Sequence, residues 1–213
     1  MSVKYHPAQI LSENRKTAVS LDLPIKGHCR PTPICAFCCY AKSGPQAFPN
    51  ATRKHDFVST YLAGNDIRQL IIEAKTFTAV RLSGSGDLNM KHLPNIIRLA
   101  RACSRTMFWG MTRKPEIATG LMKSNTPNLR MMVTVDASSP AGTWNYKGRL
   151  CYGPRRAPDS VPKNDKRIVT VFPRHCTGRI CGDVPKHKLD CPAVRHTITG
   201  GCLACGRCWN WKL

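Results

Sequence analysis

The sequence contains few acidic residues and no long apolar run. It has 12 Asp and Glu against 33 Lys and Arg in 213 residues, which gives a formal net charge of +21. So few carboxylates provide few candidates for a pair of catalytic acids in a hydrolase, and no Ser-His-Asp arrangement stands out. No segment reaches the roughly 20 apolar residues of a membrane span, and residues 1–22 lack the apolar core of a signal peptide. We therefore expect a soluble, cytoplasmic protein with no membrane partner.

The excess of positive charge points to a polyanionic partner. Such an imbalance repels itself unless anionic groups offset it, and nucleic acid is the first partner to consider. Basic residues are densest in residues 144–167, where aromatic residues lie among them. This composition suits contacts to phosphates together with stacking on exposed bases of DNA or RNA. A solvated loop with incidental charge is the alternative. The candidate nucleic-acid contacts are Trp144, Lys147, Arg149, Arg155, Arg156, Lys163, Lys166 and Arg167.

Twelve cysteines are far more than a chain of this length usually carries. Disulfides do not explain them in a reducing cytosol, so ligation of a metal or a cluster is the simplest interpretation. One group lies between residues 29 and 39 and another between residues 176 and 208, which indicates at least two separate sites. The remaining two, Cys103 and Cys151, are interpreted as small buried apolar side chains, with a ligand to a tail cluster as the alternative role.

The apolar residues alternate between strand and helix patterns along most of the chain. The expected strands are residues 17–23, 79–82, 106–110, 131–135 and 168–172. The expected helices are residues 53–76, with a break at 63–65, 92–103 and 114–123. Between residues 143 and 167 the periodicity lapses. We predict an α/β fold, a partial (β/α) barrel or parallel sheet of residues 1–172, followed by a cysteine-rich, cluster-binding segment of residues 173–213.

The loop after the first expected strand carries Cys29, Cys35, Cys38 and Cys39. Short loops of the C-x-x-C kind bring thiolates around an iron–sulfur cluster. Three cysteine ligands would leave one iron of a cubane open, and an open position distinguishes a metal site that performs chemistry from one that only supports a fold. Cys38 and Cys39 are equal candidates for the third ligand. We expect His28 to form a backbone hydrogen bond in this loop.

This loop, with Phe37 directly before Cys38, resembles the cluster loop of radical S-adenosylmethionine (SAM) enzymes, although five residues rather than three separate Cys29 from Cys35. The resemblance implies that SAM binds at the ends of the next strands. In that superfamily a glycine-rich turn after the second strand holds the amino group of SAM, and the end of the fourth strand contacts its ribose or carboxylate. A plain turn with Asp87 as a helix cap is the alternative. The residues at these positions are Ser83, Gly84, Ser85, Gly86, Asp87, Thr134 and Asp136.

A larger part of the chain is similar to the phage-encoded gene product 88 family. The similar segments are residues 11–17, Leu23-Pro24, Cys39-Tyr40-Ala41, residues 81–87, residues 109–113 and the closing cysteines. In that family the cysteine before Tyr-Ala recurs, so the resemblance favours Cys39 over Cys38 as a ligand. It also implies that the protein acts in the cytoplasm of an infected host cell.

The tail of the sequence carries the strongest metal-binding signal. Cys202-x-x-Cys205-x-x-Cys208 resembles the ferredoxin run whose steps place thiolates around one cubane. Cys176, Cys181 and Cys191 supply up to three more ligands. With the first loop, this predicts two or three [4Fe–4S] clusters. Zinc, which C-x-x-C pairs also bind, is the alternative for the tail.

These patterns lead to one main hypothesis. The protein is an iron–sulfur protein that resembles a radical SAM enzyme and binds or modifies nucleic acid. One alternative is a non-catalytic nucleic-acid-binding or regulatory iron–sulfur protein that keeps the fold without SAM chemistry. Another is a binding module stabilised by zinc.

Overall fold

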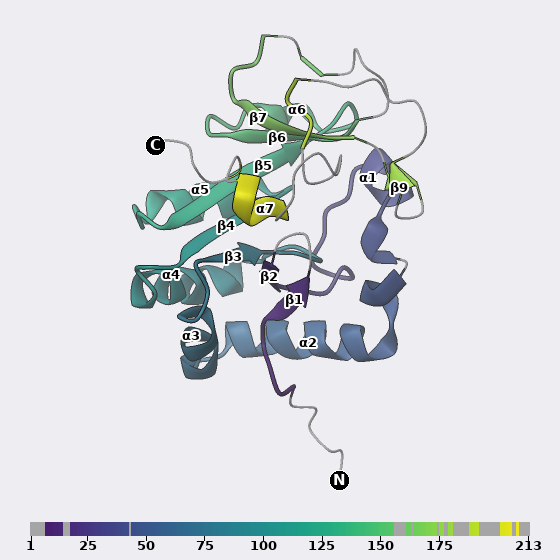
Figure 1. Cartoon of the computed structure of the whole chain (residues 1–213). Helices are drawn as coiled ribbons and strands as arrows, with labels where there is room; N and C mark the ends of the chain where they lie inside the picture. The colour runs from purple at the N-terminus through teal and green to yellow at the C-terminus, as the bar shows by residue number, and fades with distance from the viewer. Residues whose placement is uncertain are drawn as a thin grey trace.

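A seven-stranded sheet forms the centre of the molecule (Figure 1). The computed structural model describes residues 7–14, 18–42, 44–155, 161–162, 164–173, 175–176, 179–180, 188–191, 201–205 and 208. The strands follow one another across the sheet in chain order; β1 is antiparallel to β2, and each later strand is parallel to the one before it. They are β1 (Ser12–Asn14), β2 (Ala18–Leu21), β3 (Ala79–Leu82), β4 (Met107–Thr112), β5 (Leu129–Val135), β6 (Leu150–Arg155) and β7 (Ile168–Pro173).

Helices connect the parallel strands. α2 and α3 lie between β2 and β3, α4 lies between β3 and β4, and α5 lies between β4 and β5. Each of α1, α2, α4 and α5 has proline in its first turn, where the missing N–H has no intrahelical acceptor to lose. The helices are α1 (Pro33–Phe37), η1 (Tyr40–Lys42), η2 (Gly44–Ala47), α2 (Pro49–Ala63), α3 (Arg68–Ala74), η3 (Met90–His92), α4 (Leu93–Ala102), α5 (Pro115–Lys123), α6 (Ala141–Trp144) and α7 (Gly201–Cys205). A separate antiparallel pair consists of β8 (His175–Cys176) and β9 (Arg179–Ile180).

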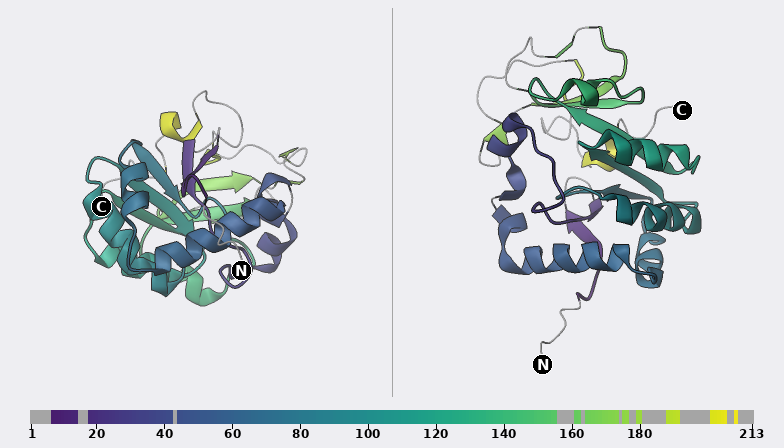
Figure 2. Two further views of the ribbon diagram at one scale, coloured as in Figure 1. Left: turned by 90° about the horizontal axis from the view of Figure 1, so that it is seen from below. Right: turned by 180° about the vertical axis from the view of Figure 1, so that it is seen from behind.

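The two faces of the sheet bury different side chains. Successive residues of a strand point to opposite faces, so Val80 and Leu82 join the core under α2 to α5. On the other face, which we call the inner face, Trp109, Met132 and Cys151 belong to a second buried cluster. In the view from below, α7 lies on the side of the sheet opposite to α2 (Figure 2).

The strand order confirms the predicted α/β class and places the carboxyl ends of the parallel strands at one edge of the sheet. Strands that follow one another in sequence are typical of (β/α) barrels, whereas doubly wound sheets reverse their order. Because β2 to β7 are parallel, their carboxyl ends lie along one edge. Loops at this edge carry the chemistry in such folds.

Most expected elements agree with the structure within a few residues. The strand at residues 79–82 coincides with β3, and the helices at residues 92–103 and 114–123 contain α4 and α5. β6 is not among the expected strands, although it pairs with both β5 and β7. Gly153 interrupts the apolar alternation there, and the pairing with β7 shifts register on both sides of Cys151-Tyr152. Within the described segments, no helix is long and apolar enough to cross a membrane.

A cysteine-rich candidate metal centre at the carboxyl edge of the sheet

The loop between β2 and α2 brings its cysteines to the carboxyl edge. Thr32 caps α1, and its hydroxyl accepts a hydrogen bond of 3.1 Å from the backbone N–H of Cys35. Pro33 occupies the first turn, which fixes the start of this short helix. Cys29, Cys35 and Cys39 are all half-buried free thiols. Local capping therefore fixes the position of Cys35 on the loop.

Cys29, Cys35 and Cys39 are close enough to influence one another. Burial raises the pKa of the Cys29 thiol to about 12, and Asp87, Cys39 and Cys35 raise it further because a second negative charge nearby is unfavourable. Burial also raises the pKa of Cys35, with Cys39 adding to the effect. Three thiols on one loop that interact in this way form a potential ligand set.

Cys38 and Cys39 differ in their interactions. Cys38 ends α1, and its backbone N–H donates to the Ile34 carbonyl at 3.2 Å. Cys39, the next residue, is the one that interacts electrostatically with both Cys29 and Cys35. Among the described residues, no three His, Cys, Asp or Glu side chains are arranged around a single metal ion. The thiols are thus neighbours on one loop without converging on one point.

Arg113 links three strands to the cysteine loop. Its Nη1 lies 3.0 Å from Oδ2 of Asp136, at the end of β5, and its Nη2 donates to the Gly153 carbonyl in β6 at 2.9 Å. Arg113 also hydrogen-bonds Cys35, which partly opposes the effect of burial on the pKa of that thiol. Asp136 is fully buried and accepts a hydrogen bond of 2.6 Å from Thr32. A buried ion pair thereby fastens the loop to the sheet.

The loop from Ser83 to Asp87 lies beside the cysteine loop, as expected from its place after β3. The Tyr40 hydroxyl donates to the Gly84 carbonyl, and His28 Nδ1 lies 3.1 Å from the Asp87 carbonyl oxygen. The second contact confirms the expected backbone hydrogen bond of His28. The nearness of the two loops is thus established, while binding of SAM between them stays a prediction.

The glycines in this loop serve close packing of the chain. A Cβ at Gly84 would lie 2.3 Å from Oδ1 of Asp22, and one at Gly86 would lie 2.2 Å from the Leu23 carbonyl oxygen. Gly86 has a φ of +68°, in the region that favours glycine. These two glycines therefore allow the loop after β3 to press against the end of β2.

The serines of this loop have buried hydroxyls. Ser83 adopts a φ of +56°, which is unusual for a residue with a side chain. The hydroxyls of Ser83 and Ser85 are buried and have no hydrogen-bond partner in the part of the chain that the structure describes. Buried polar atoms without partners and backbone strain both concentrate at functional sites.

Asp87 uses its carboxylate within the fold. Oδ2 accepts from the Thr112 hydroxyl at 3.0 Å and from the Arg113 N–H at 3.2 Å, and Oδ1 accepts from the Leu88 N–H at 2.8 Å. Burial raises the pKa of this carboxyl, although these hydrogen bonds oppose the effect. Asn89, rather than Asp87, caps the helical turn that follows, so the alternative interpretation of Asp87 as a helix cap is wrong.

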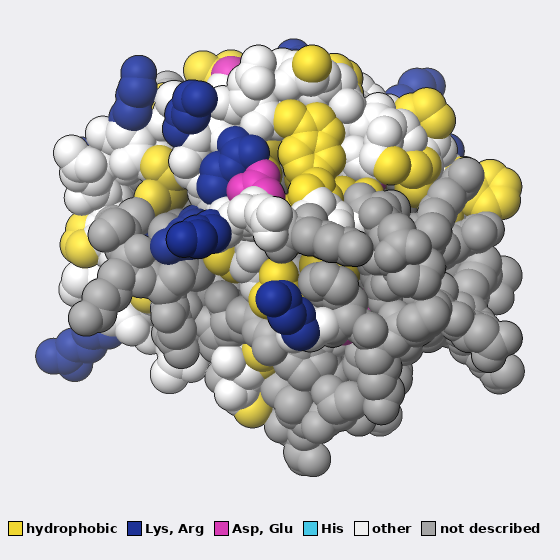
Figure 3. Space-filling model, turned by 90° about the horizontal axis from the view of Figure 1, so that it is seen from above, with side chains coloured by type: hydrophobic (Ala, Val, Ile, Leu, Met, Phe, Trp, Pro, Cys, Tyr) yellow, Lys and Arg dark blue, Asp and Glu magenta, His cyan; other side chains and the backbone are white. Residues whose placement is uncertain are grey.

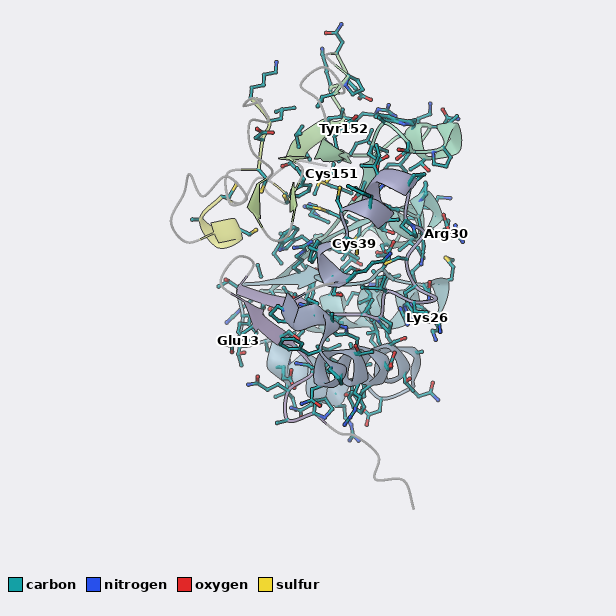
Figure 4. The ribbon with its side chains drawn as sticks, turned by 90° about the vertical axis from the view of Figure 1, so that its right-hand side faces the viewer. Glu13, Lys26, Arg30, Cys39, Cys151 and Tyr152 are labelled. Carbon is teal, nitrogen blue, oxygen red and sulfur yellow. The ribbon has the colours of Figure 1, made fainter. Side chains whose placement is uncertain are left out.

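The described tail cysteines lie on the inner face of the sheet. Cys191, Cys202 and Cys208 are buried there together with Cys151 of β6, and Cys205 is half-buried. Thr134, one of the residues expected near SAM, hydrogen-bonds Cys151. Figure 4 shows Cys151 in the sheet and Cys39 on the loop after β2. The side chain of Cys176 and the whole of Cys181 lie outside the described residues.

The basic residues between 144 and 167 are divided between the two edges of the sheet. Lys147 and Arg149 precede β6, and Lys166 and Arg167 precede β7, so all four lie at the amino edge. Arg155 ends β6 at the carboxyl edge. Seen from above, basic side chains stand at separate places on the described surface (Figure 3). The side chain of Arg155 and the residues Arg156 and Lys163 fall outside what the structure describes.

Two of these predicted contacts have structural roles. Arg167 pairs with Asp165 and donates to the carbonyls of Trp144 and Tyr146. Trp144 is half-buried, and its ring lies 6.0 Å from the ring of Tyr152, which is itself buried. The Trp144 ring therefore packs against the core.

This fold and site define a class of protein. It is an α/β protein whose parallel strands follow one another in chain order and carry a cysteine loop at their carboxyl edge. The family model for gene product 88 (GP88) matches residues 4–211, and the chain belongs to the gene product 88 family. The predicted phage gene-product family is thereby confirmed. No curated protein and no solved structure matches the chain.

Proposed function

We propose that this protein is an iron–sulfur protein of the radical SAM type that acts on nucleic acid. The observation that carries the proposal is the grouping of Cys29, Cys35 and Cys39 on one loop at the carboxyl edge of a sequential parallel sheet. Three thiolate ligands suit a [4Fe–4S] cluster with one open iron. Such a cluster binds its thiolates at three different irons, so the ligands need not converge on one point.

The surroundings of the cysteine loop fit a bound cofactor. The hydroxyls of Ser83 and Ser85, which have no hydrogen-bond partner among the described residues, lie in the loop that contacts Tyr40 and His28. Arg113 reaches Cys35 from the sheet and supplies positive charge next to the proposed thiolates. When such a cluster is bound and reduced, its chemistry is the transfer of one electron to SAM, which breaks a carbon–sulfur bond and yields methionine and a 5′-deoxyadenosyl radical.

Nucleic acid is the substrate class that the charge supports. The chain carries a net charge of +21, and exposed lysines stand on loops at the carboxyl edge. Lys26, Lys42 and Lys91 are exposed there, as is Arg30, which pairs with Glu116 at 2.6 Å. Figure 4 shows Lys26 and Arg30 on one side of this region. Positive groups around the site would hold phosphates close to the cysteine loop.

Adjacent cysteine variants test the proposal. Protein prepared without oxygen should contain a cubane at the first loop, and Cys39→Ala should lose about four irons per chain. Cys38→Ala, the matched control on the neighbouring residue, should keep them. With dithionite as electron donor, the control should convert SAM into methionine and 5′-deoxyadenosine, while Cys39→Ala should show at least a hundredfold lower rate.

The outcomes distinguish the competing functions. Equal iron content in both variants would overturn the ligand assignment. A cluster that depends on Cys39 but gives no 5′-deoxyadenosine would favour a non-catalytic or regulatory iron–sulfur protein. Stoichiometric zinc without iron would instead indicate a zinc-stabilised module.

A further inference from the structure

Four buried cysteines from distant parts of the chain meet on the inner face of the sheet. Cys151, Cys191, Cys202 and Cys208 are exposed by at most 9% and belong to one buried cluster. Cys151 comes from β6. Cys191 is held beside β7 because its N–H donates to the Val171 carbonyl at 2.8 Å. None of these four described cysteines takes part in a disulfide. None of the four belongs to the three-cysteine loop.

The electrostatics of these thiols agree with their close approach. Burial raises the pKa of Cys208 well above its ordinary value, and Cys151, Cys191 and Cys202 raise it further. Burial likewise raises the pKa of Cys151 to about 12, and Cys191 contributes. Each thiol would be hard to ionise beside the others unless a metal took up the charge.

Polar groups on the inner face surround this cluster. Thr134 and Thr170 are the register neighbours of Cys151 on β5 and β7. Thr134 hydrogen-bonds Cys151, whereas the fully buried Thr170 hydroxyl has no hydrogen-bond partner among the described residues. Arg81 stacks on Trp109, with its guanidinium carbon 5.5 Å from the ring centre, and its Nε is buried and equally without a partner in the described chain.

Arg81 also lies close to the cysteines. Burial alone would lower the pKa of Arg81, yet neighbouring acidic groups raise it, and Cys202 and Cys208 are among them. Hydrogen-bond donors and a positive charge that face sulfur atoms are the groups that stabilise an anionic iron–sulfur cluster and tune its potential.

We infer that Cys151, Cys191, Cys202 and Cys208 are the four ligands of a second [4Fe–4S] cluster, which joins the tail of the chain to the inner face of the sheet. Four thiolates around an oxidised cubane leave a net charge of roughly −2, which Arg81 offsets in part. With no ligand position left open, this cluster is closed, in contrast to the one proposed at the first loop.

The arrangement of the thiols favours a cubane over zinc. A single zinc ion draws four sulfur atoms to one point, but the described cysteines are not arranged around one ion. A cubane binds each thiolate at a separate iron and therefore suits thiols that share a pocket without converging.

Cys205 lies one turn from Cys202 on α7 and is only half-buried, so the run of three cysteines supplies two ligands rather than three.

The second cluster is tested in a variant that lacks the ligands of the first. A full-length variant in which Cys29, Cys35 and Cys39 are replaced by Ala should retain about four irons per chain, with the visible absorption of a cubane. In this background, Cys151→Ala should lose at least 80% of the remaining iron and sulfide. Cys103→Ala is the matched control, because Cys103 is equally buried in the core under the helices. It should keep the full amount, and so should Cys205→Ala.

A serine variant keeps the test decisive if Cys151→Ala fails to fold. Cys151→Ser is nearly the same size and offers oxygen in place of sulfur, so it should fold and bind iron with an altered electron paramagnetic resonance spectrum. Full iron content in Cys151→Ala, an unchanged spectrum in Cys151→Ser, or four-thiolate zinc in the background variant would each overturn the assignment. Loss of the iron in Cys205→Ala as well would also overturn it, because Cys205 would then be a ligand.

Discussion

Arg113 Nη1 lies 3.0 Å from Oδ2 of Asp136, and both side chains are largely withdrawn from water: Asp136 has no exposed side-chain surface and Arg113 has 11%. A buried ion pair of this kind stabilises the fold only when both partners are present, because either one alone is an uncompensated charge. Since the Asp136 carboxylate also accepts from Thr32, the pair connects β4 and β5 to the cysteine loop.

Replacing Asp136 with Asn should destabilise the protein strongly. The amide keeps the shape but leaves Arg113 buried without its counter-charge, which typically costs about 3–5 kcal/mol. Urea unfolding of the purified protein measures this as a lower transition midpoint. Asp66→Asn is the control, because Asp66 forms an exposed pair with Arg68 at 2.7 Å. A similar midpoint for both variants would show that the buried pair stabilises the fold no more than the exposed pair does.

Stability should fall as the pH falls from about 6.5 toward 4. Burial lowers the pKa of His92 to about 4, and burial also lowers the pKa values of His28 and His55. Between these pH values the unfolded chain binds more protons than the folded one, because an unfolded histidine titrates near 6.5. The stability that these histidines contribute is therefore fully present above about pH 6.5 and is lost on acidification.

The His92 contribution to this loss should be roughly 3 kcal/mol. Urea unfolding at a series of pH values measures it, and His92→Gln should flatten the curve in this window because glutamine does not titrate. An equally steep curve in that variant would exclude His92 as the main cause.

Gly86→Ala should disturb the carboxyl edge. The new Cβ would meet the Leu23 and Pro24 carbonyl oxygens at 2.2 and 2.4 Å, and the φ of +68° adds strain. Overpacking and left-handed backbone together should lower the unfolding free energy by about 2–4 kcal/mol. Gly142→Ala is the matched control, since no atom lies within 4 Å of its added Cβ. Thermal unfolding should show a lower midpoint for Gly86→Ala alone.

Nucleic-acid binding should depend on which edge of the sheet loses charge. Arg155→Ala with Arg156→Ala removes two charges, at the last residue of β6 and at the next residue of the sequence, whereas Lys147→Ala with Lys166→Ala removes two at the amino edge. If substrate phosphates approach the cysteine loop, the arginine pair should reduce the salt dependence of single-strand affinity by about 0.7 in log–log slope per lost contact. The lysine pair should leave it unchanged. Fluorescence anisotropy at several salt concentrations measures both slopes. If the amino edge is the binding surface, the lysine pair will reduce the slope and the arginine pair will leave it unchanged.

Elements with regular apolar spacing could be predicted from the sequence, and long-range contacts could not. β3 and α4 show complete periodic patterns, so their positions are close to those expected. β6 contains Gly153 and Pro154, which hide its strand pattern. Because that strand was missed, nothing in the sequence distinguished Cys151 from Cys103, another isolated buried cysteine. The ion pair between Arg113 and Asp136 joins two strand ends and has no local signal.

The chain-order arrangement of the strands also has a consequence for how the protein is made. During synthesis each parallel strand leaves the ribosome after the strand that it pairs with, so the sheet from β2 to β7 can grow in one direction without waiting for later segments. Cys151 enters this growing sheet with β6, and its inferred partners Cys202 and Cys208 are translated more than 50 residues later. The inner-face cluster that we infer would thus be completed only after the three-cysteine loop has been made.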